Sequence, residues 1–501
     1  MTKNVSSSEH TQVPHVVGPY RVIPLIQEGA MAASHTKAAD ADVQESLGLP
    51  GTLVEDWHDK AIARLGQLVK QRRGLRVFLD TCTKCGACTD KCHYFLGTHD
   101  PNNMPVARQD LMRSVYRRYF TFTGKVFPWL VGARKLDKKL LQDWYTYFHQ
   151  CSECRRCTVY CPKGIDTSEV TMAGREILAS VGLGQQYSQE IITKVKTIGN
   201  NLGMKPRAMA DVLENLEEDI LEDTGIPVKL PLDDETADML LVTPSADFFA
   251  EPHVDGLIGY AKVLHQAGIR WTLSSEASEA ANFGLFTGQH DHMREIALRI
   301  RHAAMGLGVN RIVIGECGHA WRVAYSFLDQ LVGPMEFLHA DHPRAEHICE
   351  VTHQLLSQGL ITLNSAANEG VVVTYHDSCN VARGAGMGDA PGGQFKIPRE
   401  LLAASVPKLV DMSKDTIAQA TFCCGGGGGL LTDDQIDLRT KGALPRAQAL
   451  QAVVTSDQVT HLVAICAICK TQLSEVLPHH NLSSVRVTSL HHLVGNALVL
   501  T

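Results

Sequence analysis

The chain has 501 residues, 44% of them hydrophobic and 20% charged, which is typical of a soluble globular protein with two to four domains. Its formal net charge of −7 argues against general nucleic-acid binding, and its first residues lack the apolar core of a signal peptide. No apolar run approaches the roughly 18 to 20 residues that span a bilayer. The 15 cysteines are therefore expected in a reducing, cytoplasmic compartment, where they are more often metal ligands than disulfides.

The first half of the chain is predicted to be helical. Residues 1–55 are polar and rich in Ala, Ser and His, and we expect a loosely ordered arm there. A helical pattern begins at Trp57 and continues through about Asp223, which defines a helical domain over 56–225. The acidic, Pro-containing stretch 217–238 has the composition of an interdomain linker, assigned to 226–238.

Within this half the pattern C-x2-C-x2-C-x3-C occurs twice, and the second copy is followed by Pro162. This spacing is typical of 4Fe–4S ferredoxins, in which the fourth cysteine of each run ligates the other cluster. The alternative, a pair of four-cysteine zinc sites, usually presents two well-separated C-x2-C pairs. We therefore predict two cubane 4Fe–4S clusters, one held by Cys82, Cys85, Cys88 and Cys161, the other by Cys151, Cys154, Cys157 and Cys92.

The 58 residues between the two runs are too many for a minimal ferredoxin and predict an inserted helical segment. Residues 108–139 of this insert carry nine Lys or Arg residues against two Asp residues. Six aromatic residues are interleaved with them: Tyr116, Tyr119, Phe120, Phe122, Phe127 and Trp129. Two interpretations stay open. The segment is either a solvated basic face or a docking surface for a membrane subunit near anionic headgroups.

The second half alternates short buried-type strands with helical segments. The strands are predicted at 239–246, 311–317, 371–379 and 461–466, and helices lie between them, as at 256–268 and 293–308. Such alternation favours α/β units with mainly parallel sheets. The predicted fold class is α+β multidomain, with a helical two-cluster ferredoxin domain followed by two tandem α/β domains over 239–365 and 366–501.

The two α/β segments also align with each other by short stretches. Residues 240–248 align with 371–379, residues 278–287 with 423–432, and residues 312–320 with 461–469. The first copy has lost its cysteines except Cys317, which stands opposite Cys466. The sequence therefore predicts one degenerate and one complete copy of the same unit.

The complete copy carries a second cysteine constellation, formed by Cys379, Cys423, Cys424, Cys466 and Cys469. In a parallel sheet these residues would converge at the carboxyl edge, where open α/β folds bind ligands. Adjacent cysteines cannot readily bind one iron together, but they can bridge different irons of a larger cluster. Glycines 425–429 would let backbone and cluster approach closely. The alternative is a flexible loop with buried structural thiols.

These residues resemble the CCG domain of heterodisulfide reductases, as a tandem pair over about 239–501. Joined to a two-cube domain, the architecture is similar to the HdrD type of subunit. The tracts NFGLFTG (282–288) and GECGHAWR (315–322) resemble the DsrK branch of this family, the cytoplasmic catalytic subunits of DsrMKJOP membrane complexes. The resemblance implies one noncubane 4Fe–4S cluster at the complete site, whose irons engage a substrate sulfur. The degenerate copy departs from members with two such clusters.

The resemblance further implies a heterodisulfide reductase-like oxidoreductase acting on sulfur groups. Electrons would pass between a membrane quinone and cytochrome b module (DsrM-like) and a disulfide or trisulfide on a small sulfur carrier (DsrC-like). The chain would lie on the inner face of the cytoplasmic membrane, attached through this and other Dsr subunits. Two alternatives stay open: a subunit acting on small thiol coenzymes, and a non-catalytic electron-transfer subunit of a membrane dehydrogenase.

A few further residues are candidates around the site. Cys317 and His319 of the degenerate copy are expected to line the cleft that faces the complete one. Glu316 and His376 are weaker candidates for proton delivery, and a local structural hydrogen bond is at least as plausible for each of these, as it is for His319. Cys349, in a helical pattern, is expected to be a buried core thiol. RGAGMG (383–388) lacks the strand–loop–helix context of a nucleotide-binding motif.

Overall fold

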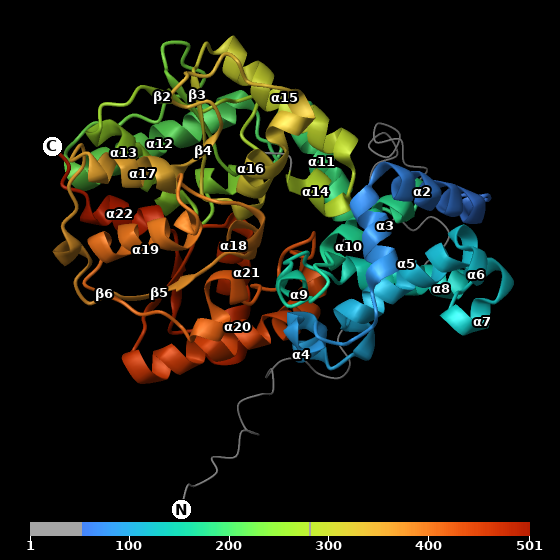
Figure 1. Cartoon of the computed structure of the whole chain (residues 1–501). Helices are drawn as coiled ribbons and strands as arrows, with labels where there is room; N and C mark the ends of the chain where they lie inside the picture. Colours follow the sequence, from blue (N-terminus) through green and yellow to red (C-terminus); the bar gives the residue numbers. More distant parts are fainter. Residues whose placement is uncertain (1–52, 280–281) are drawn as a thin grey trace, which may run out of the picture.

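The computed structural model describes residues 53–279 and 282–501, so almost all of the arm expected over 1–55 lies outside the described residues. A helical N-terminal part lies beside two α/β units, which are placed one above the other in Figure 1. All named strands follow residue 238, within the described residues. This arrangement confirms the predicted fold class. No helix in the described ranges is both long and apolar enough to cross a bilayer.

The helical part is built around α10, almost all of which is buried. Gly174 on this helix allows the ring of Phe148 to pack against the backbone, because an added Cβ would lie 2.4 Å from that ring. Its helices are α2 (Trp57–Gln71), α3 (Arg73–Thr81), α4 (His93–Thr98), α5 (Pro105–Phe120), α6 (Phe122–Val126), α7 (Pro128–Val131), α8 (Lys138–His149), α9 (Arg156–Val159), α10 (Thr167–Ser180), α11 (Gln186–Ile198) and α12 (Pro206–Thr224).

One boundary in this part differs from the sequence-based expectation. The helical pattern that starts at Trp57 is divided at Arg72, whose backbone leaves the helical region at φ −104° and ψ 88°. The last helix of this part, α12, ends at Thr224. Val228 and Leu230 beyond it are buried against the first α/β unit. The amide of Leu273 donates to the carbonyl of Pro231, so this segment follows the sheet edge.

Each α/β unit has a four-stranded parallel sheet, and the two sheets have the same topology. The strand orders are β2-β1-β3-β4 and β6-β5-β7-β8. The strands are β1 (Met239–Val242), β2 (Trp271–Thr272), β3 (Arg311–Ile314), β4 (Glu346–His347), β5 (Val372–His376), β6 (Lys408–Leu409), β7 (His461–Ala464) and β8 (Arg486–Thr488). All four predicted strands are present but end two to four residues earlier, because the following residues turn into loops and helices.

The helices of the α/β units lie between these strands in the chain, as βαβ connections require, except for α22, which follows β8. They are α13 (Val254–Gln266), α14 (Asn282–Thr287), α15 (His290–Gly306), α16 (Gly318–Val332), α17 (Ile348–Ser357), α18 (Cys379–Gly384), α19 (Gly393–Ser405), α20 (Ile436–Asp457), α21 (Ala467–Val476) and α22 (Leu490–Ala497). The two helical patterns noted in the sequence, 256–268 and 293–308, correspond to α13 and α15.

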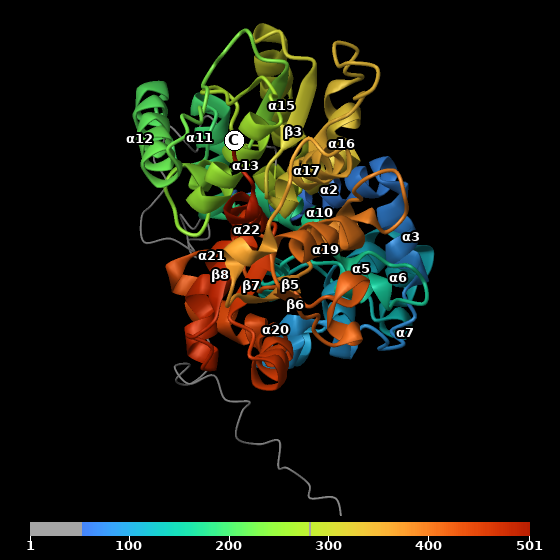
Figure 2. The same ribbon diagram turned by 90° about the vertical axis from the view of Figure 1, so that its left-hand side faces the viewer.

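The two units contact each other through α13 and α22, which lie side by side in both views (Figures 1 and 2). Glycines make this close approach possible. A Cβ on Gly259 would lie 1.9 Å from the carbonyl of His491, and one on Gly495 would lie 2.9 Å from Gly259 itself. The pairing fixes the two sheets relative to each other, and therefore also the loops that follow their strands.

Candidate iron–sulfur centres

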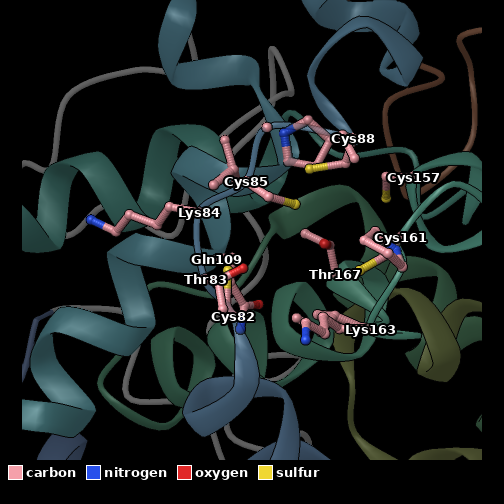
Figure 3. A pocket seen from close by; sticks show the side chains of 16 residues that line it. Cys82, Thr83, Lys84, Cys85, Cys88, Gln109, Cys157, Cys161, Lys163 and Thr167 are labelled. Carbon is pink, nitrogen blue, oxygen red and sulfur yellow. The ribbon is translucent and has the colours of Figure 1, made fainter.

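The first cysteine run surrounds a small hollow that is partly open to solvent. Figure 3 shows the sulfurs of Cys85, Cys88 and Cys161 gathered around this space. The loop can turn so tightly because Lys84 and Gly86 both adopt positive φ, at 54° and 79°. The four cysteines assigned to the first cubane cluster all line the hollow: Cys82, Cys85, Cys88 and Cys161.

A second small hollow lies beside the first. The guanidinium of Arg108 donates to the Cys92 sulfur at 3.6 Å, and the amide of Glu153 donates to the Cys151 sulfur at 3.4 Å. Cys157 lines both hollows, so the two are neighbours. The four cysteines assigned to the second cubane cluster all line this one: Cys92, Cys151, Cys154 and Cys157.

The residues present fit iron–sulfur clusters in both hollows. Each hollow gathers four soft sulfur donors, and hydrogen bonds to those sulfurs are already in place in the second. Burial raises the pKa of Cys88 to about 11, and burial also raises the pKa of Cys157 above its usual range. Such thiols become thiolates when a metal replaces the proton. Among the described residues, no three Cys, His, Asp or Glu side chains converge on a single-ion site.

The five cysteines of the second constellation come together at the carboxyl edge of the second sheet. Cys379 begins α18 after β5, and Cys466 caps α21 after β7. Cys423 and Cys424 lie in the loop between β6 and α20, and the Cys379 and Cys423 sulfurs are 4.0 Å apart. All five side chains are buried.

The thiols of this site influence one another directly. Hydrogen bonds from Cys154, Cys379 and Cys424 lower the pKa of Cys423 well below its usual range. A hydrogen bond from Cys469 lowers the pKa of Cys466, and the hydrogen bond that Cys469 donates to Cys424 raises the pKa of Cys469. The sulfurs therefore form one continuous group. Neighbouring thiols at such spacing fit a cluster with several irons, each of which takes its own ligands.

Cys154 belongs to both sites. It lines the second hollow, and its hydrogen bond to Cys423, followed by burial, raises its pKa well above the usual range. Cys423 in turn is 4.0 Å from Cys379. The second cysteine run and the five-cysteine site are therefore in direct side-chain contact, with no intervening layer of protein. The sequence placed these residues in separate domains and carried no indication of this contact.

Three of the five glycines pack against the helical part, and two of these, Gly427 and Gly428, contact the second cysteine run. A Cβ on Gly428 would lie 2.5 Å from the Cys151 carbonyl, and one on Gly427 would lie 3.0 Å from the carbonyl of Ser152. A Cβ on Gly429 would lie 2.2 Å from the side chain of Gln185. The absence of side chains therefore serves a backbone-to-backbone contact between the helical part and the loop, a reason that the sequence interpretation did not include.

Three polar side chains of the helical part hold the carbonyls of this loop. Tyr94 donates to Gly425 at 2.5 Å and Gln185 donates to Gly429 at 2.6 Å. Arg175 donates to Gly428 at 2.8 Å and to Cys151 at 2.6 Å. Sequence reasoning missed all three residues. The only available signal was the position of Tyr94, two residues after Cys92.

Residues of the degenerate unit reach the five-cysteine site, as expected. The Nδ1 atom of His319 lies 3.6 Å from the Cys466 sulfur, and its ring packs edge-on against Phe286 at 4.6 Å. Its Nε2 atom has no hydrogen-bond partner among the described residues and lies near Gly427. Cys317 is buried beside it, and burial followed by the charge of Cys466 raises its pKa.

The tract 315–322 connects the two α/β units. Glu316 pairs with His491 at 2.7 Å and with Lys470 at 3.6 Å, all three fully buried, so its role here is structural. Trp321 donates to Gly386 and Arg322 donates to Asn380, both at 2.9 Å. These bonds bridge the first unit to the second.

The remaining candidates are His376, Cys349 and the RGAGMG segment. His376 is buried without a partner for either ring nitrogen among the described residues, and burial lowers its pKa well below the usual range. Cys349 is fully buried in α17, as predicted. The RGAGMG segment closes α18, and Arg383 within it donates to the carbonyl of Cys154 at 2.5 Å.

Known proteins with similar sequences identify the family of this chain. Residues 78–165 match the family described as a 4Fe-4S dicluster domain, and residues 373–474 match that of a cysteine-rich domain. The chain is 37% identical to the Hdr-like menaquinol oxidoreductase iron-sulfur subunit 2 of Archaeoglobus fulgidus, over 90% of this chain and 85% of that protein. This chain belongs to the Hdr-like oxidoreductase iron–sulfur subunits.

More distant relatives lie in the same group. The iron-sulfur subunit of the Hdr-like menaquinol oxidoreductase of Archaeoglobus profundus is 36% identical over 90% of this chain and 84% of its own length. The HdrD chain of the dihydromethanophenazine:CoB–CoM heterodisulfide reductase of Methanosarcina mazei is 25% identical over 79% of this chain and 88% of its length. No solved structure gave a significant match.

These matches confirm the resemblance at the level of the HdrD-like, CCG-containing family. The Hdr-like chain is an iron–sulfur oxidoreductase subunit, and its two matched domains support iron–sulfur clusters. The narrower DsrK resemblance, the number and type of clusters, and the substrate go beyond these findings.

Proposed function

We propose that this Hdr-like subunit exchanges electrons between a membrane quinone module and an S–S bond carried by a small protein. The membrane partner would be a DsrM-like cytochrome b subunit, and the S–S bond a disulfide or trisulfide on a DsrC-like sulfur carrier. The observation that carries the proposal is the contact of Cys154 with Cys423, which joins the electron-carrying run to the five-cysteine site. The names of relatives, which include a menaquinol oxidoreductase and a heterodisulfide reductase, agree with both ends of this path.

The proposed cofactors are two cubane 4Fe–4S clusters in the two hollows and one noncubane 4Fe–4S cluster at the five cysteines. When bound, these clusters supply one-electron transfers and an iron that can take a sulfur of the substrate. The protein contributes buried thiolates, backbone carbonyls held by Arg175 and Tyr94, and a site from which the packed glycine loop excludes water. We place the chain in the cytoplasm, on the inner face of the cytoplasmic membrane through its partner subunits.

Breaking one S–S bond requires two electrons and two protons. His319 is the proposed source of one proton, because its free Nε2 atom lies near the glycine loop while Nδ1 contacts Cys466. Cys317, buried at the same place, is proposed to line the substrate side of the site. Because Glu316 is engaged in a structural ion pair, it is not part of the proposed proton path.

Metal content tests the cofactor assignment. Anaerobically purified protein should contain about twelve irons and as much sulfide per chain, the sum of three four-iron clusters. Cys424→Ala should lose about four irons, whereas Cys349→Ala, which removes a buried thiol remote from every proposed ligand set, should lose none. Stoichiometric zinc in place of iron would contradict the assignment.

Activity measurements test whether the five-cysteine site carries out S–S reduction and the cubane clusters deliver the electrons. Cys424→Ala should abolish S–S reduction while chemical reductants still reduce both cubes. Cys154→Ala should slow the reduction of the five-cysteine site from the quinol side, because Cys154 is the contact between the two sites. A Cys424→Ala protein with full activity would show that the S–S chemistry lies elsewhere.

The main competing function is reduction of a small heterodisulfide coenzyme, favoured by the similarity to the methanogen HdrD chain. Purified complex should be offered both a trisulfide-loaded carrier protein and the CoB–CoM heterodisulfide. Preference for the carrier by more than tenfold in kcat/KM supports the proposal, and the reverse preference supports the alternative. If neither were reduced while electrons passed through, the protein would be an electron-transfer component only.

A further inference from the structure

Helices α6 and α7 form a short projection at the outer end of the helical part (Figure 1). Phe122 is 79% exposed, Trp129 72% and Leu130 69%, which makes them the three most exposed large hydrophobic side chains among the described residues. Val126 and Phe127 beside them are also exposed. Apolar side chains gathered on one projection indicate an interaction surface. We call residues 122–131 the tip.

The tip has a fixed shape. Arg117 donates to the carbonyl of Val131 at 2.7 Å, and Arg118 donates to that of Lys125 at 3.0 Å, so α5 holds the projection at α6 and at the end of α7. Gly124 allows the approach, because an added Cβ would lie 2.0 Å from the Arg117 carbonyl. The rings of Phe127 and Trp129 pack edge to face with centroids 5.7 Å apart. The apolar residues are therefore presented in a defined arrangement.

The surroundings of the tip are strongly basic. Residues 114–139 contain seven Lys or Arg residues and a single acidic residue, Asp137, whose carboxylate caps α8 by accepting from the amide of Leu140. The exposed cations are Lys125, Arg134, Lys135, Lys138 and Lys139. Because the whole chain carries −7, this face is the one that an anionic surface would attract.

We propose that the tip inserts into the interfacial region of an anionic lipid bilayer. Phe and Trp side chains are favoured at the headgroup boundary, and flanking Lys and Arg residues pair with anionic lipids. The remainder of the chain is net negative, because the whole chain carries −7 although residues 114–139 are net positive. The occupant is therefore the lipid itself, in addition to any protein that the chain binds.

Insertion would also set the orientation of the first hollow. Helix α5 begins at Pro105, which lines that hollow, and ends at Phe120, next to the tip. Its 16 residues span about 24 Å at 1.5 Å per residue. A bilayer that holds the tip would thus keep the first hollow about one helix length from the membrane. The proposal itself rests on the exposed surface and not on the function proposed above.

Vesicle sedimentation of the whole, cluster-loaded protein tests the proposal. Binding is expected to vesicles of phosphatidylglycerol and phosphatidylcholine, but only weakly to phosphatidylcholine alone, and it should fall in 0.5 M salt as charges are screened. Phe122→Ser with Trp129→Ser should weaken binding at least tenfold. Phe249→Ser, at a side chain 53% exposed on the α/β half, is the matched control and should change nothing.

Two further measurements separate lipid from protein partners. Lys125→Glu with Lys135→Glu should abolish the phosphatidylglycerol preference, and iron content should be unchanged. Brominated lipids should quench Trp129 fluorescence, and Trp129→Phe should remove that quenching while binding persists. The proposal is overturned if lipid vesicles without protein fail to bind the chain, or if the tip variants affect only binding to a reconstituted membrane subunit.

Discussion

The guanidinium of Arg175 donates 2.8 Å to the carbonyl of Gly428 and so joins helix α10 to the glycine loop of the second α/β unit. The same side chain also donates to the carbonyls of Cys151 and Phe286, at 2.6 and 2.8 Å. The same guanidinium also forms an ion pair with the buried carboxylate of Glu153 at 3.1 Å. One side chain thus fixes the second cysteine run, the loop and the degenerate unit relative to one another.

Replacing Arg175 should therefore destabilise the protein strongly. Arg175→Gln leaves Glu153 buried without its partner, and loss of one member of a buried ion pair typically costs about 3–5 kcal/mol. Burial already raises the pKa of Glu153 to about 7, despite the opposing charge of Arg175. Urea unfolding of the two proteins measures the difference.

Arg270→Gln is the control for that change. Arg270 pairs with Asp238 at 2.7 Å on the exposed surface, where such pairs contribute at most about 1 kcal/mol. If both variants unfolded at the same urea concentration, the network around Arg175 would be incidental to stability.

The close contact of the glycine loop can be separated from its backbone conformation. Gly428→Ala puts a Cβ 2.5 Å from the Cys151 carbonyl at a φ of 71°. Gly164 has a similar φ of 64° but open space around it, so Gly164→Ala carries only the conformational cost of roughly 1–2 kcal/mol. We expect Gly428→Ala to cost about 1–3 kcal/mol more, from overpacking. Thermal denaturation and iron content should be measured for both variants. Equal losses of stability would mean that the loop moves aside without cost.

The charge of Arg108 should tune the second cubane cluster. Its side chain is buried and donates to the Cys92 sulfur, and a fixed cation favours the reduced, more negative state of a cluster. A charged hydrogen bond of about 1.5–3 kcal/mol corresponds to roughly 60–120 mV for a one-electron couple. Arg108→Gln should lower the reduction potential by up to that amount in an EPR-monitored titration. Lys84→Gln, at the solvent-accessible first run, should shift the reduction potential of the second cluster little. If Arg108→Gln left that potential unchanged, the proposed role of Arg108 would be wrong.

The buried pairing of Glu316 predicts a pH dependence of stability. Burial raises its pKa, but Lys470 and His491 outweigh burial, and the pKa falls to about 2. A carboxyl with a depressed folded pKa stabilises above its unfolded pKa, near 4.5, and loses that contribution as pH falls toward 2. A shift of this size corresponds to about 3 kcal/mol.

Urea unfolding midpoints at pH 7 and pH 3 measure this contribution. The wild type should lose stability between these values, and Glu316→Gln should start lower at pH 7 and lose less. Glu369→Gln, at an exposed carboxyl, should keep the wild-type pH dependence. If Glu316→Gln lost as much stability between pH 7 and pH 3 as the wild type, another group would be responsible for the acid sensitivity.

The sequence was most informative where chemistry follows directly from local pattern. Cys379 and Cys466 were predicted at the carboxyl edge of a sheet because each follows a short apolar strand, and parallel strands end at the same edge. The pairing of the four-cysteine runs followed from spacing alone. The contact partners Tyr94, Arg175 and Gln185 were not predictable in this way, because they meet the glycine loop across 244 to 331 residues of chain.

Charge counting shows a second limit of sequence patterns. The basic insert counts nine Lys or Arg residues, yet Arg108 and Arg113 are buried and bind sulfur or backbone carbonyls. Composition alone cannot separate such structural cations from those on the surface. Acidic composition is equally ambiguous, because Glu217 lies within α12, where its carboxylate accepts from the amide of Leu230.

Cys423 and Cys424 are buried, and Gly427 and Gly428 beyond them pack against the backbone of Cys151 and Ser152, which constrains how the protein matures. Iron and sulfide would not reach these thiols once the glycine loop and the helical part are packed together. The five cysteines extend from Cys379 to Cys469, so the proposed ligand set is complete only after residue 469 has been synthesised. A cluster at this site would therefore be inserted before the N-terminal half docks against the loop.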